Sequence, residues 1–325
     1  MSIELRVLGR ETVADRVDAF TLGRPDGGAL PAWTPGSHID LTLPGGLIRQ
    51  YSLCSDSADS VTWRVAVLYE LDGRGGSVAA HKHLQVGARV HADGPRDNFG
   101  FRADRAETVE SAETGESAES ADVFFIAGGI GITPILPMVR AADAAGVDWR
   151  LLYLGRSRES MSFLGELEAY GDRVTVHPSN DRGRIYLASA VTSTGLDTPQ
   201  IFACGPERML DALTECCPVG SLHVERFTGN GTGAEVTDTS FIVKTNDGTE
   251  IAVAADETIL AAMTRCGVPA LNSCQEGICG TCETVVLGGV PLHRDEVLSD
   301  DERDSNETMM ICVSRSVGER LVLDL

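Results

Sequence analysis

Four cysteines near the C-terminal end restrict the fold of this chain more than any other feature. Cys274, Cys279 and Cys282 follow one another with the spacing C-x4-C-x2-C, and Cys312 stands alone in the segment ICVSR. Thiolates gathered by such a loop are ligands for soft metal ions. The chain around them must therefore fold as a closely wrapped metal-binding loop, with a fourth ligand supplied from far along the sequence.

The spacing favours an iron–sulfur cluster over a zinc site. Zinc sites usually show two C-x2–4-C pairs, or one pair with histidines. Here the fourth cysteine has no second pair, and C-x4-C-x2-C is the plant-type ferredoxin spacing rather than the bacterial one. We predict a 2Fe–2S cluster on all four cysteines. Gly277 and Gly280 let the loop wrap closely, so that backbone N–H groups point at the sulfurs.

The remaining cysteines of the chain are interpreted differently. In a reducing compartment cysteines stay unpaired, and an isolated one behaves as a small apolar residue. We expect four of them to be buried for this reason: Cys54, Cys216, Cys217 and Cys266.

The chain has 325 residues, enough for two or three domains. Residues 1–101 contain short alternating apolar runs, such as 38–43 and 62–69, separated by Gly- and Pro-containing turns. This pattern predicts an antiparallel β-barrel. Residues 239–325 begin with a hairpin across Asn246-Asp247-Gly248 and continue through a short helix near 258–266 into the cysteine loop. We expect them to form an α+β, β-grasp ferredoxin domain.

Between these two parts the pattern changes period. In residues 122–228 short apolar runs alternate with helical stretches, which predicts βα units and a parallel α/β sheet. The expected strands are residues 123–127, 150–155, 173–177, 200–205 and 222–227. The expected helices are residues 134–145, 162–170 and 206–216.

Two linkers are expected to join the three domains. Residues 102–121 have almost no large apolar side chain and carry glutamate at every third position from 107 to 119. The all-round polarity predicts a solvated, disordered linker, with a helix as the alternative. Residues 229–238 are rich in Gly and Thr, which indicates a second linker.

A glycine-rich turn in the α/β segment indicates a nucleotide site. The sequence FFIAGGIGITP places Gly128, Gly129, Ile130 and Gly131 between a strand and a helix, with Thr133 and Pro134 opening that helix. Glycines allow backbone N–H groups to approach a pyrophosphate at a helix N-terminus. A tight βα turn without a ligand is the alternative. Two features follow other strands of the same sheet, where a nucleotide would bind: Arg156-Ser157 and Cys204-Gly205-Pro206.

The barrel segment contains a second anion-binding pattern. In RQYSL, Arg49 could balance a phosphate, Tyr51 could pack on a ring system, and Ser52 could hydrogen-bond a flavin nitrogen. Gly75, Gly76 and Ser77 precede a short helix, VAAHKHL, and a Gly-rich turn into a helix is an anion site. Without this context RQYSL is an ordinary strand.

Taken together, the motifs resemble those of the phthalate dioxygenase reductase family, which belongs to the ferredoxin–NADP reductase superfamily. R-x-Y-S-L, G-R-G-G-S, A-G-G-I-G-I-T-P, C-G-P, H-x-E-x-F and the C-terminal cysteines occur here in that family's order. The resemblance covers nearly the whole chain. Residues 102–121 depart from it, because the family joins barrel and nucleotide domain more briefly.

The resemblance implies FMN on the barrel, NADH on the α/β domain, with NADPH possible, and the 2Fe–2S cluster. It implies FMN contacts at a first set of residues: Arg49, Tyr51, Ser52, Val67, Leu68, Gly75, Gly76, Ser77, Thr133, Glu225 and Phe227. It implies a nicotinamide nucleotide site at a second set: Gly128, Gly129, Ile130, Gly131, Thr133, Pro134, Arg156, Ser157, Cys204, Gly205 and Pro206. Ser52, Cys204 and Glu225 would flank the reacting atoms, with Cys204 near the transferring carbon and not as a nucleophile.

The implied reaction is hydride transfer from NADH to FMN, followed by single electrons to the cluster and then to a partner. The expected partner is a Rieske-type terminal oxygenase. A haem-thiolate monooxygenase and a redox-sensing role without turnover are the alternatives.

The net charge of −21 excludes some partners and favours others. It argues against nucleic acid and against an anionic membrane surface. No apolar run approaches the length of a membrane helix and no signal pattern opens the chain, so we expect a cytoplasmic protein. The run DEVLSDDERDSNE at 295–307 is expected to flank the cluster and meet a basic partner, with a solvated loop as the alternative.

Overall fold

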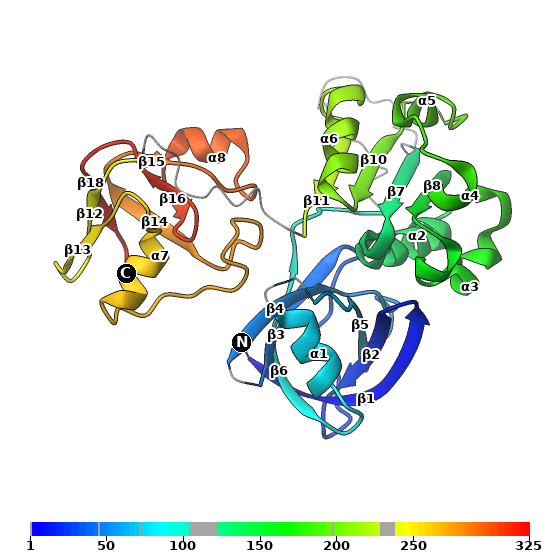
Figure 1. Cartoon of the computed structure of the whole chain (residues 1–325), viewed down its shortest axis with the longest axis horizontal. Coiled ribbons are helices and arrows are strands. Elements are labelled where there is room, and N and C mark those ends of the chain that lie inside the picture. Colours follow the sequence, from blue (N-terminus) through cyan, green and yellow to red (C-terminus); the bar gives the residue numbers. More distant parts are fainter. Residues whose placement is uncertain are drawn as a thin grey trace, which may run out of the picture. The chain divides into compact units, whose positions relative to one another are not determined.

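The computed structural model describes residues 2–44, 46–71, 73, 75–103, 122–196, 198–227 and 238–325 (Figure 1). They form two compact units, Met1–Arg226 and Phe227–Leu325. The expected linkers fall mostly outside these ranges, so their structure stays a prediction. Within the described residues, no helix has the length and apolar character needed to cross a membrane.

The first part of unit one is an antiparallel six-stranded sheet in the order β4-β3-β6-β1-β2-β5. A bridge between Leu53 and Val65 joins its two ends and closes it into a barrel. Inward side chains such as Phe20 and Trp63 fill the interior. The strands are β1 (Ile3–Ala14), β2 (Val17–Gly23), β3 (Ser37–Leu43), β4 (Leu47–Ser52), β5 (Thr62–Leu68) and β6 (Arg89–Asp97). Helix α1 (Gly76–His83) packs against β3, β4 and β5 (Figure 1).

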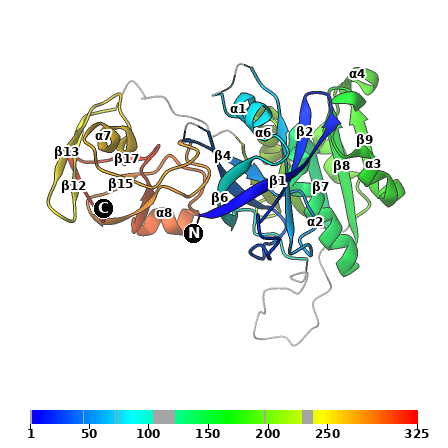
Figure 2. The same cartoon turned by 90° about the horizontal axis from the view of Figure 1, so that it is seen from below.

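The second part of unit one is a parallel sheet in the order β11-β10-β7-β8-β9. Its strands are β7 (Val123–Gly128), β8 (Trp149–Gly155), β9 (Val174–Pro178), β10 (Gln200–Cys204) and β11 (Leu222–Glu225). Its helices and 3-10 turns are η2 (Gly129–Gly131), α2 (Ile132–Ala145), η3 (Arg158–Ser160), α3 (Leu164–Leu167), η4 (Glu168–Arg173), α4 (Ser179–Arg182), α5 (Leu187–Thr192) and α6 (Glu207–Cys216). This arrangement, with α2 and α6 beside the strands in Figure 2, confirms the predicted α/β class.

Strand β7 shows why this sheet has helices on both faces. Phe125 and Ala127 join a core with α2, whereas Phe124 and Ile126 join a second core with α6. Successive side chains of a strand point to opposite faces, so a continuously apolar strand must be covered on both.

The prediction of one helix over residues 162–170 was wrong in its extent. Phe163 has a left-handed backbone, φ 62°, and α3 is a single turn that passes into the 3-10 turn η4. Gly165 lies inside α3 and Gly171, φ 56°, interrupts η4; glycine is a poor helix former. The short helices α4 and α5 were not foreseen either.

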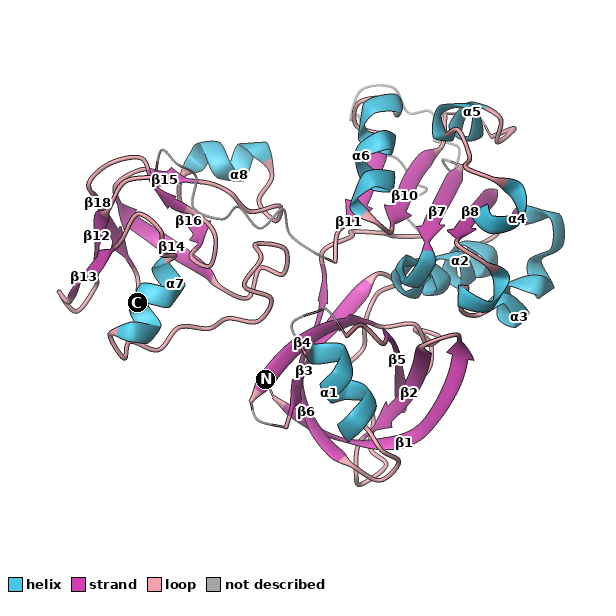
Figure 3. Cartoon of the chain, viewed as in Figure 1, coloured by secondary structure: helices cyan, strands magenta, loops and turns pink. Residues whose placement is uncertain are grey.

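Unit two is a mixed five-stranded sheet in the order β13-β12-β18-β14-β16, with a separate β15-β17 pair (Figure 3). Strands β12 (Phe241–Thr245) and β18 (Arg320–Leu323) are parallel, and the other neighbours are antiparallel. The remaining strands are β13 (Glu250–Val253), β14 (Glu283–Gly288), β15 (Pro291–Leu292), β16 (Thr308–Met310) and β17 (Arg315–Ser316). Helix α7 (Ile259–Arg265), capped by Thr258, packs its apolar side into the sheet's core, and α8 (Asp300–Ser305) begins with a capping box from Ser299.

The two-sided burial of β7 yields a stability prediction. Phe125 is completely buried, so Phe125→Ala should lower the free energy of unfolding of unit one by about 3–5 kcal/mol. Tyr186→Ala, at a side chain 75% exposed, is the control and should change it by less than about 0.5 kcal/mol. Urea denaturation of both variants measures this. Equal losses in the two variants would contradict the two-sided core.

Candidate functional site

The N-terminus of α1 and strand β4 together form a place for an anion. Gly75 has φ 75°, a left-handed conformation that favours glycine, and it leads directly into α1. A Cβ at Gly76 would lie 2.7 Å from Cδ of Arg49, so the Arg49 side chain crosses the first turn of the helix. The guanidinium and the unpaired N–H groups of a first helical turn both favour a phosphate. The cradle therefore fits the phosphate of FMN.

Ser77 contributes to this cradle through its backbone only. Its hydroxyl already bonds the carbonyl and the N–H of Glu70, both at 3.0 Å. The Ser77 hydroxyl therefore secures the turn before the helix, and a role of Ser77 at the phosphate stays a prediction.

Strand β5, which is expected to line the flavin, is held to α1 by a histidine. His81 Nε2 lies 2.8 Å from the carbonyl oxygen of Val67, and its Nδ1 lies 3.2 Å from Asp18. Val67 is buried in the barrel core and Leu68 is partly buried. The strand expected to line the flavin ring is thus tied to the helix expected to bind its phosphate.

The glycine loop and the C-G-P segment meet at the carboxyl ends of β7 and β10. A Cβ at Gly131 would lie 2.8 Å from the nitrogen of Gly205, and one at Gly128 would lie 2.6 Å from Cδ of Pro206. A Cβ at Gly205 would in turn lie 2.9 Å from Cα of Gly128. Three of the motif glycines are therefore required by close backbone packing. Gly129 is different, because its φ of 55° is left-handed and the space beside it is open.

The start of α2 is fixed in the same region. Thr133 is buried, and its hydroxyl donates to the carbonyl of Ile130 at 3.0 Å. Pro134 lies in the first turn, where its missing N–H removes no helical bond. Arg156 and Arg158 follow β8 and are exposed, and Ser157 caps η3. This edge of the sheet has the open backbone and the cations that a nicotinamide nucleotide needs.

Ser52, Cys204 and Glu225 come together where the barrel meets the sheet. Cys204 on β10 is opposite Glu225 on β11, and Ser52 on β4 bonds the Glu225 carboxylate. Sequence reasoning missed a fourth member, His38 on β3, which is opposite Ser52. His38 is 1% exposed, and its Nδ1 lies 3.7 Å from Glu225 Oε1. The signal was a polar residue at the start of the alternating run HIDLTL, which patterning alone could not distinguish from a packed histidine.

Burial controls the protonation of this group. Burial raises the pKa of the Glu225 carboxyl, and the Asp97 carboxylate adds to the rise, whereas His38 and Ser52 oppose it. Burial also raises the pKa of the Cys204 thiol well above its usual value, and the Glu225 carboxylate contributes to that rise. Cys204 therefore stays a neutral thiol at physiological pH, which argues against a nucleophilic role.

The four predicted cluster ligands in unit two, Cys274, Cys279, Cys282 and Cys312, are buried and in contact. Cys274 interacts with Cys279 and Cys312, and Cys282 also interacts with Cys312. Among the residues that the structure describes, no three His, Cys, Asp or Glu side chains converge where a single metal ion could bind. Four contacting thiols with the C-x4-C-x2-C spacing fit a 2Fe–2S cluster.

Backbone geometry supports the close wrap of this loop. Gly277 and Gly280 have φ of 72° and 73°, and a Cβ at Gly277 would lie 2.6 Å from Val313. The N–H of Glu276 donates to the Cys274 sulfur at 3.3 Å. Donors of this kind stabilise a reduced, more negative cluster.

The acidic run at 295–307 contains both a buried and several exposed acidic residues. Asp295, 4% exposed, accepts the N–H groups of Val297 and Leu298 at 3.2 and 2.9 Å. The N–H of Glu296 donates to the carbonyl of Gly277 at 2.9 Å, which places the beginning of the run against the cysteine loop. Asp295 is therefore structural, and the exposed charge of the run lies on α8 and on Glu296 and Glu307 at either side of it.

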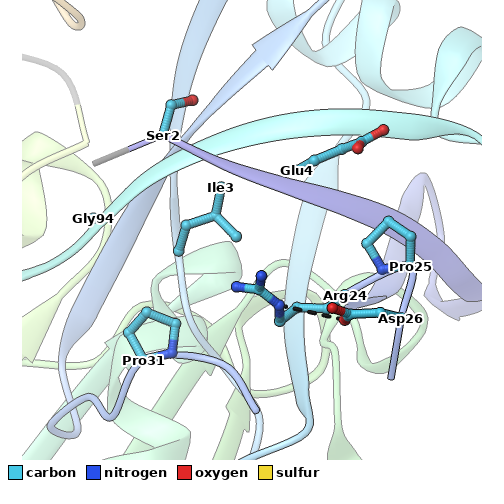
Figure 4. Close-up of a pocket in the computed structure, with 8 residues that line it drawn as sticks. All are labelled: Ser2, Ile3, Glu4, Arg24, Pro25, Asp26, Pro31 and Gly94. Atoms are coloured by element: carbon cyan, nitrogen blue, oxygen red, sulfur yellow. Dashed lines mark ion pairs between the residues drawn. The ribbon is translucent and has the colours of Figure 1, made fainter. Parts of the chain in front are cut away.

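Two further residues and one hollow remain to be placed. Cys266 was expected to be buried and is exposed, because it follows α7 after the helix has turned Ala262 and Met263 into the core. Phe227 is 38% exposed and belongs to unit two. The hollow in Figure 4 contains no predicted site residue, and its Arg24 and Asp26 pair with each other at 3.4 Å. It lacks the converging polar groups of a binding site.

Comparison with known proteins identifies the family. Residues 242–317 match the 2Fe-2S iron-sulfur cluster binding domain, and residues 125–215 match the oxidoreductase NAD-binding domain. The chain is 39% identical to phenoxybenzoate dioxygenase subunit beta of Ectopseudomonas oleovorans, over 99% of this chain and 97% of that protein. It is also 32% identical to phthalate dioxygenase reductase of Burkholderia cepacia, over 99% and 97%. The chain belongs to the phthalate dioxygenase reductase family.

Solved structures agree with this assignment. A structure of phthalate dioxygenase reductase, described as modular for electron transfer from pyridine nucleotides to [2Fe-2S], matches with TM-score 0.70 at 31% identity and covers 100% of this chain and 98% of that one. An intact type IV self-sufficient cytochrome P450 monooxygenase matches with TM-score 0.86 at 40% identity. This chain spans 41% of that protein's length. The predicted fold class, of barrel, α/β domain and ferredoxin domain, is confirmed.

Family membership also confirms the predicted cofactors and enzyme class. The protein is an oxidoreductase, and its cofactors are FMN, a 2Fe–2S cluster and NADH. The anion cradle on α1, the glycine edge of the parallel sheet and the four contacting cysteines each fit one of these groups. The roles of single residues remain predictions.

The raised pKa of Glu225 yields a pH prediction. A carboxyl whose pKa is raised in the folded state stabilises the fold fully below the pKa that it has in the unfolded chain, 4.5. This stabilisation is lost as the pH rises from 4.5 through the raised pKa of the folded state. Glu225→Gln removes this loss, so the variant should unfold at a higher temperature than the wild type at pH 8, and the advantage should shrink toward pH 4.5. Thermal melts across this range measure it, with the exposed Glu168→Gln as control. If the unfolding temperatures of Glu225→Gln and the wild type differed by the same amount at every pH, the raised pKa of Glu225 would be contradicted.

Proposed function

We propose that this protein is the NADH-dependent reductase of an oxygenase system whose terminal component is a Rieske-type oxygenase. The observation that carries the proposal is end-to-end similarity to separate reductase subunits. The chain covers 97% of phenoxybenzoate dioxygenase subunit beta and 99% of a toluene-4-sulfonate monooxygenase system reductase subunit of Comamonas testosteroni. A chain with this organisation holds every electron-transfer centre and leaves substrate oxidation to a partner.

When bound, FMN would supply hydride acceptance from NADH together with single-electron release, and the 2Fe–2S cluster would supply one-electron transfer to a partner. This chain's residues bind and orient. Arg49 and the first turn of α1 hold the phosphate, and β5 at Val67 and Leu68 lines the ring. When Glu225 is protonated, its carboxyl can donate to the Ser52 oxygen, which leaves the Ser52 hydroxyl proton for a hydrogen bond toward the flavin. The left-handed Gly129 with Thr133 seats the nicotinamide.

The buried group at the end of β10 has two roles in this proposal. Glu225, with its raised pKa, holds or releases a proton beside Ser52 and His38. Cys204 stays an uncharged thiol and provides an apolar, close-packed surface for the nicotinamide. Little water reaches this place, because Cys204 is fully buried and the Glu225 side chain is only 13% exposed, and exclusion of water protects a transferring hydride.

NADH is the proposed donor, with NADPH as the alternative. Arg156 and Arg158 are exposed beyond β8 and could meet a 2′-phosphate. We place the protein in the cytoplasm, since its cysteines are unpaired in the described structure and thiols persist in a reducing compartment.

A haem-thiolate monooxygenase is the second candidate partner. The TM-score of 0.86 against a self-sufficient P450 supports it, because that protein contains a region with the same fold over the whole length of this chain.

If the four cysteines hold the cluster, removing one of them should stop electron transfer to cytochrome c without stopping the reduction of FMN by NADH. Cys312→Ser should abolish the cluster's visible absorption and lower NADH-dependent cytochrome c reduction at least about 100-fold, because one thiolate ligand is lost. Reduction of FMN by NADH should persist, since its site lies in unit one. Cys266→Ser, an exposed cysteine outside the cluster loop, is the matched control and should leave both reactions unchanged. Retention of the cluster in Cys312→Ser would overturn the ligand assignment.

Reconstitution distinguishes the two partners. The holoprotein should support NADH-dependent turnover of a Rieske-type oxygenase that has been freed of its own reductase, and salt should slow transfer if α8 is the docking charge. Product formation and NADH consumption are measured together. Turnover with a haem-thiolate monooxygenase alone would reverse the assignment.

A further inference from the structure

The carboxylate of Glu166 contacts both the barrel and the α/β part of unit one. Glu166 on α3 accepts from Arg64 of β5 at 2.6 Å through Oε1. Its other oxygen, Oε2, accepts from Arg140 of α2. Arg64 belongs to the barrel, whereas Glu166 and Arg140 belong to the α/β part. The carboxylate therefore bridges two guanidinium groups that come from different parts of the fold.

The contact continues into a closed ring of hydrogen bonds. Arg140 donates to the carbonyl oxygen of Cys54 at 2.9 Å, and the N–H of Cys54 donates to the carbonyl oxygen of Arg64 at 2.8 Å. Arg64 then returns to Glu166. A closed ring is stiffer than a single ion pair, because each member is held from two sides.

This ring of hydrogen bonds connects the segments that are proposed to hold the flavin and the nicotinamide. Cys54 follows Ser52 after one residue, and Arg64 precedes Val67 on the flavin-lining strand. Arg140 lies two turns after Thr133 on α2, whose first turn adjoins the glycine loop. Glu166 itself contacts neither cofactor site.

Burial makes these bonds stronger than those of an open surface pair. The side chains of Arg64 and Arg140 are 20% and 22% exposed, and that of Glu166 is 36% exposed. The Arg64 guanidinium also lies over the ring of the buried Phe163, 4.7 Å from its centroid, and pairs with Glu11 at 3.2 Å. Partly buried, shared charges are screened less by salt than exposed ones.

We propose that Glu166 is a positioning residue for hydride transfer: it fixes the distance between the nicotinamide end of α2 and the flavin-lining strand β5. The inference rests on the proposed function. Hydride transfer needs its atoms about 3–3.5 Å apart, and a misplacement of about 1 Å costs on the order of 100-fold in rate. Loss of the bridge should slow flavin reduction with little change in the binding of either cofactor.

The test compares three holoproteins loaded with FMN and cluster: wild type, Glu166→Gln and Glu166→Ala. Glu168→Gln, an exposed glutamate in the adjacent η4, is the matched control. Anaerobic stopped-flow mixing with NADH gives the flavin reduction rate at saturation and the apparent NADH affinity. The long-wavelength nicotinamide–flavin absorption reports how closely the rings approach, and FMN affinity is measured separately by fluorescence.

We expect Glu166→Ala to lower the saturating flavin reduction rate about 10- to 100-fold and to weaken the long-wavelength absorption, with FMN and NADH affinities within about threefold of wild type. Glu166→Gln should lie between Ala and wild type, and it also serves if Ala folds poorly. A lower unfolding temperature with an unchanged reduction rate and absorption would overturn the proposal and leave a purely structural bridge. Absence of flavin reduction in the wild type would instead refute the proposed function.

Discussion

The contact of Glu225 with His38 and Ser52 joins the two parts of unit one at the place where hydride transfer is proposed to occur. Glu225 ends a strand of the parallel sheet, whereas His38 and Ser52 lie on neighbouring strands of the barrel. A carboxylate placed in such a site is costly unless it is paired or protonated. The pairing therefore requires the two parts of unit one to meet at this edge, and it brings the flavin-side serine within reach of the nucleotide-side glutamate.

A second contact between the same two parts lies on another side of the sheet. The Glu166 bridge holds α2 to β5, and the Glu225 contact holds β11 to β3 and β4. Two separate attachments resist rotation as well as separation. The nucleotide edge, built by close packing of the glycine loop on Cys204-Gly205-Pro206, is thereby presented to the barrel in one orientation.

Several parts of the site could be predicted from sequence because their function requires particular residue types at short spacing. The cysteine loop, the glycine turn and RQYSL are local motifs, and the structure shows local reasons for them: left-handed glycines, a helix start, a strand position. Other residues could not be found this way. His38 and Glu166 matter through contacts with residues far away in the chain, and a histidine or glutamate in a sequence does not reveal its partner. Cys266 illustrates the opposite error, because its exposure depends on where α7 ends.

The sequence by itself indicated the cofactors, the order of barrel, α/β sheet and ferredoxin fold, and the family, since thiolate spacing and glycine requirements follow from covalent geometry and coordination chemistry. The tertiary structure decided which side chains surround the reacting atoms and how the barrel and the sheet are held together. It also decided that Asp295 supports the cysteine loop instead of meeting a partner. These outcomes depend on burial and on long-range pairing, which exist only once the chain has folded.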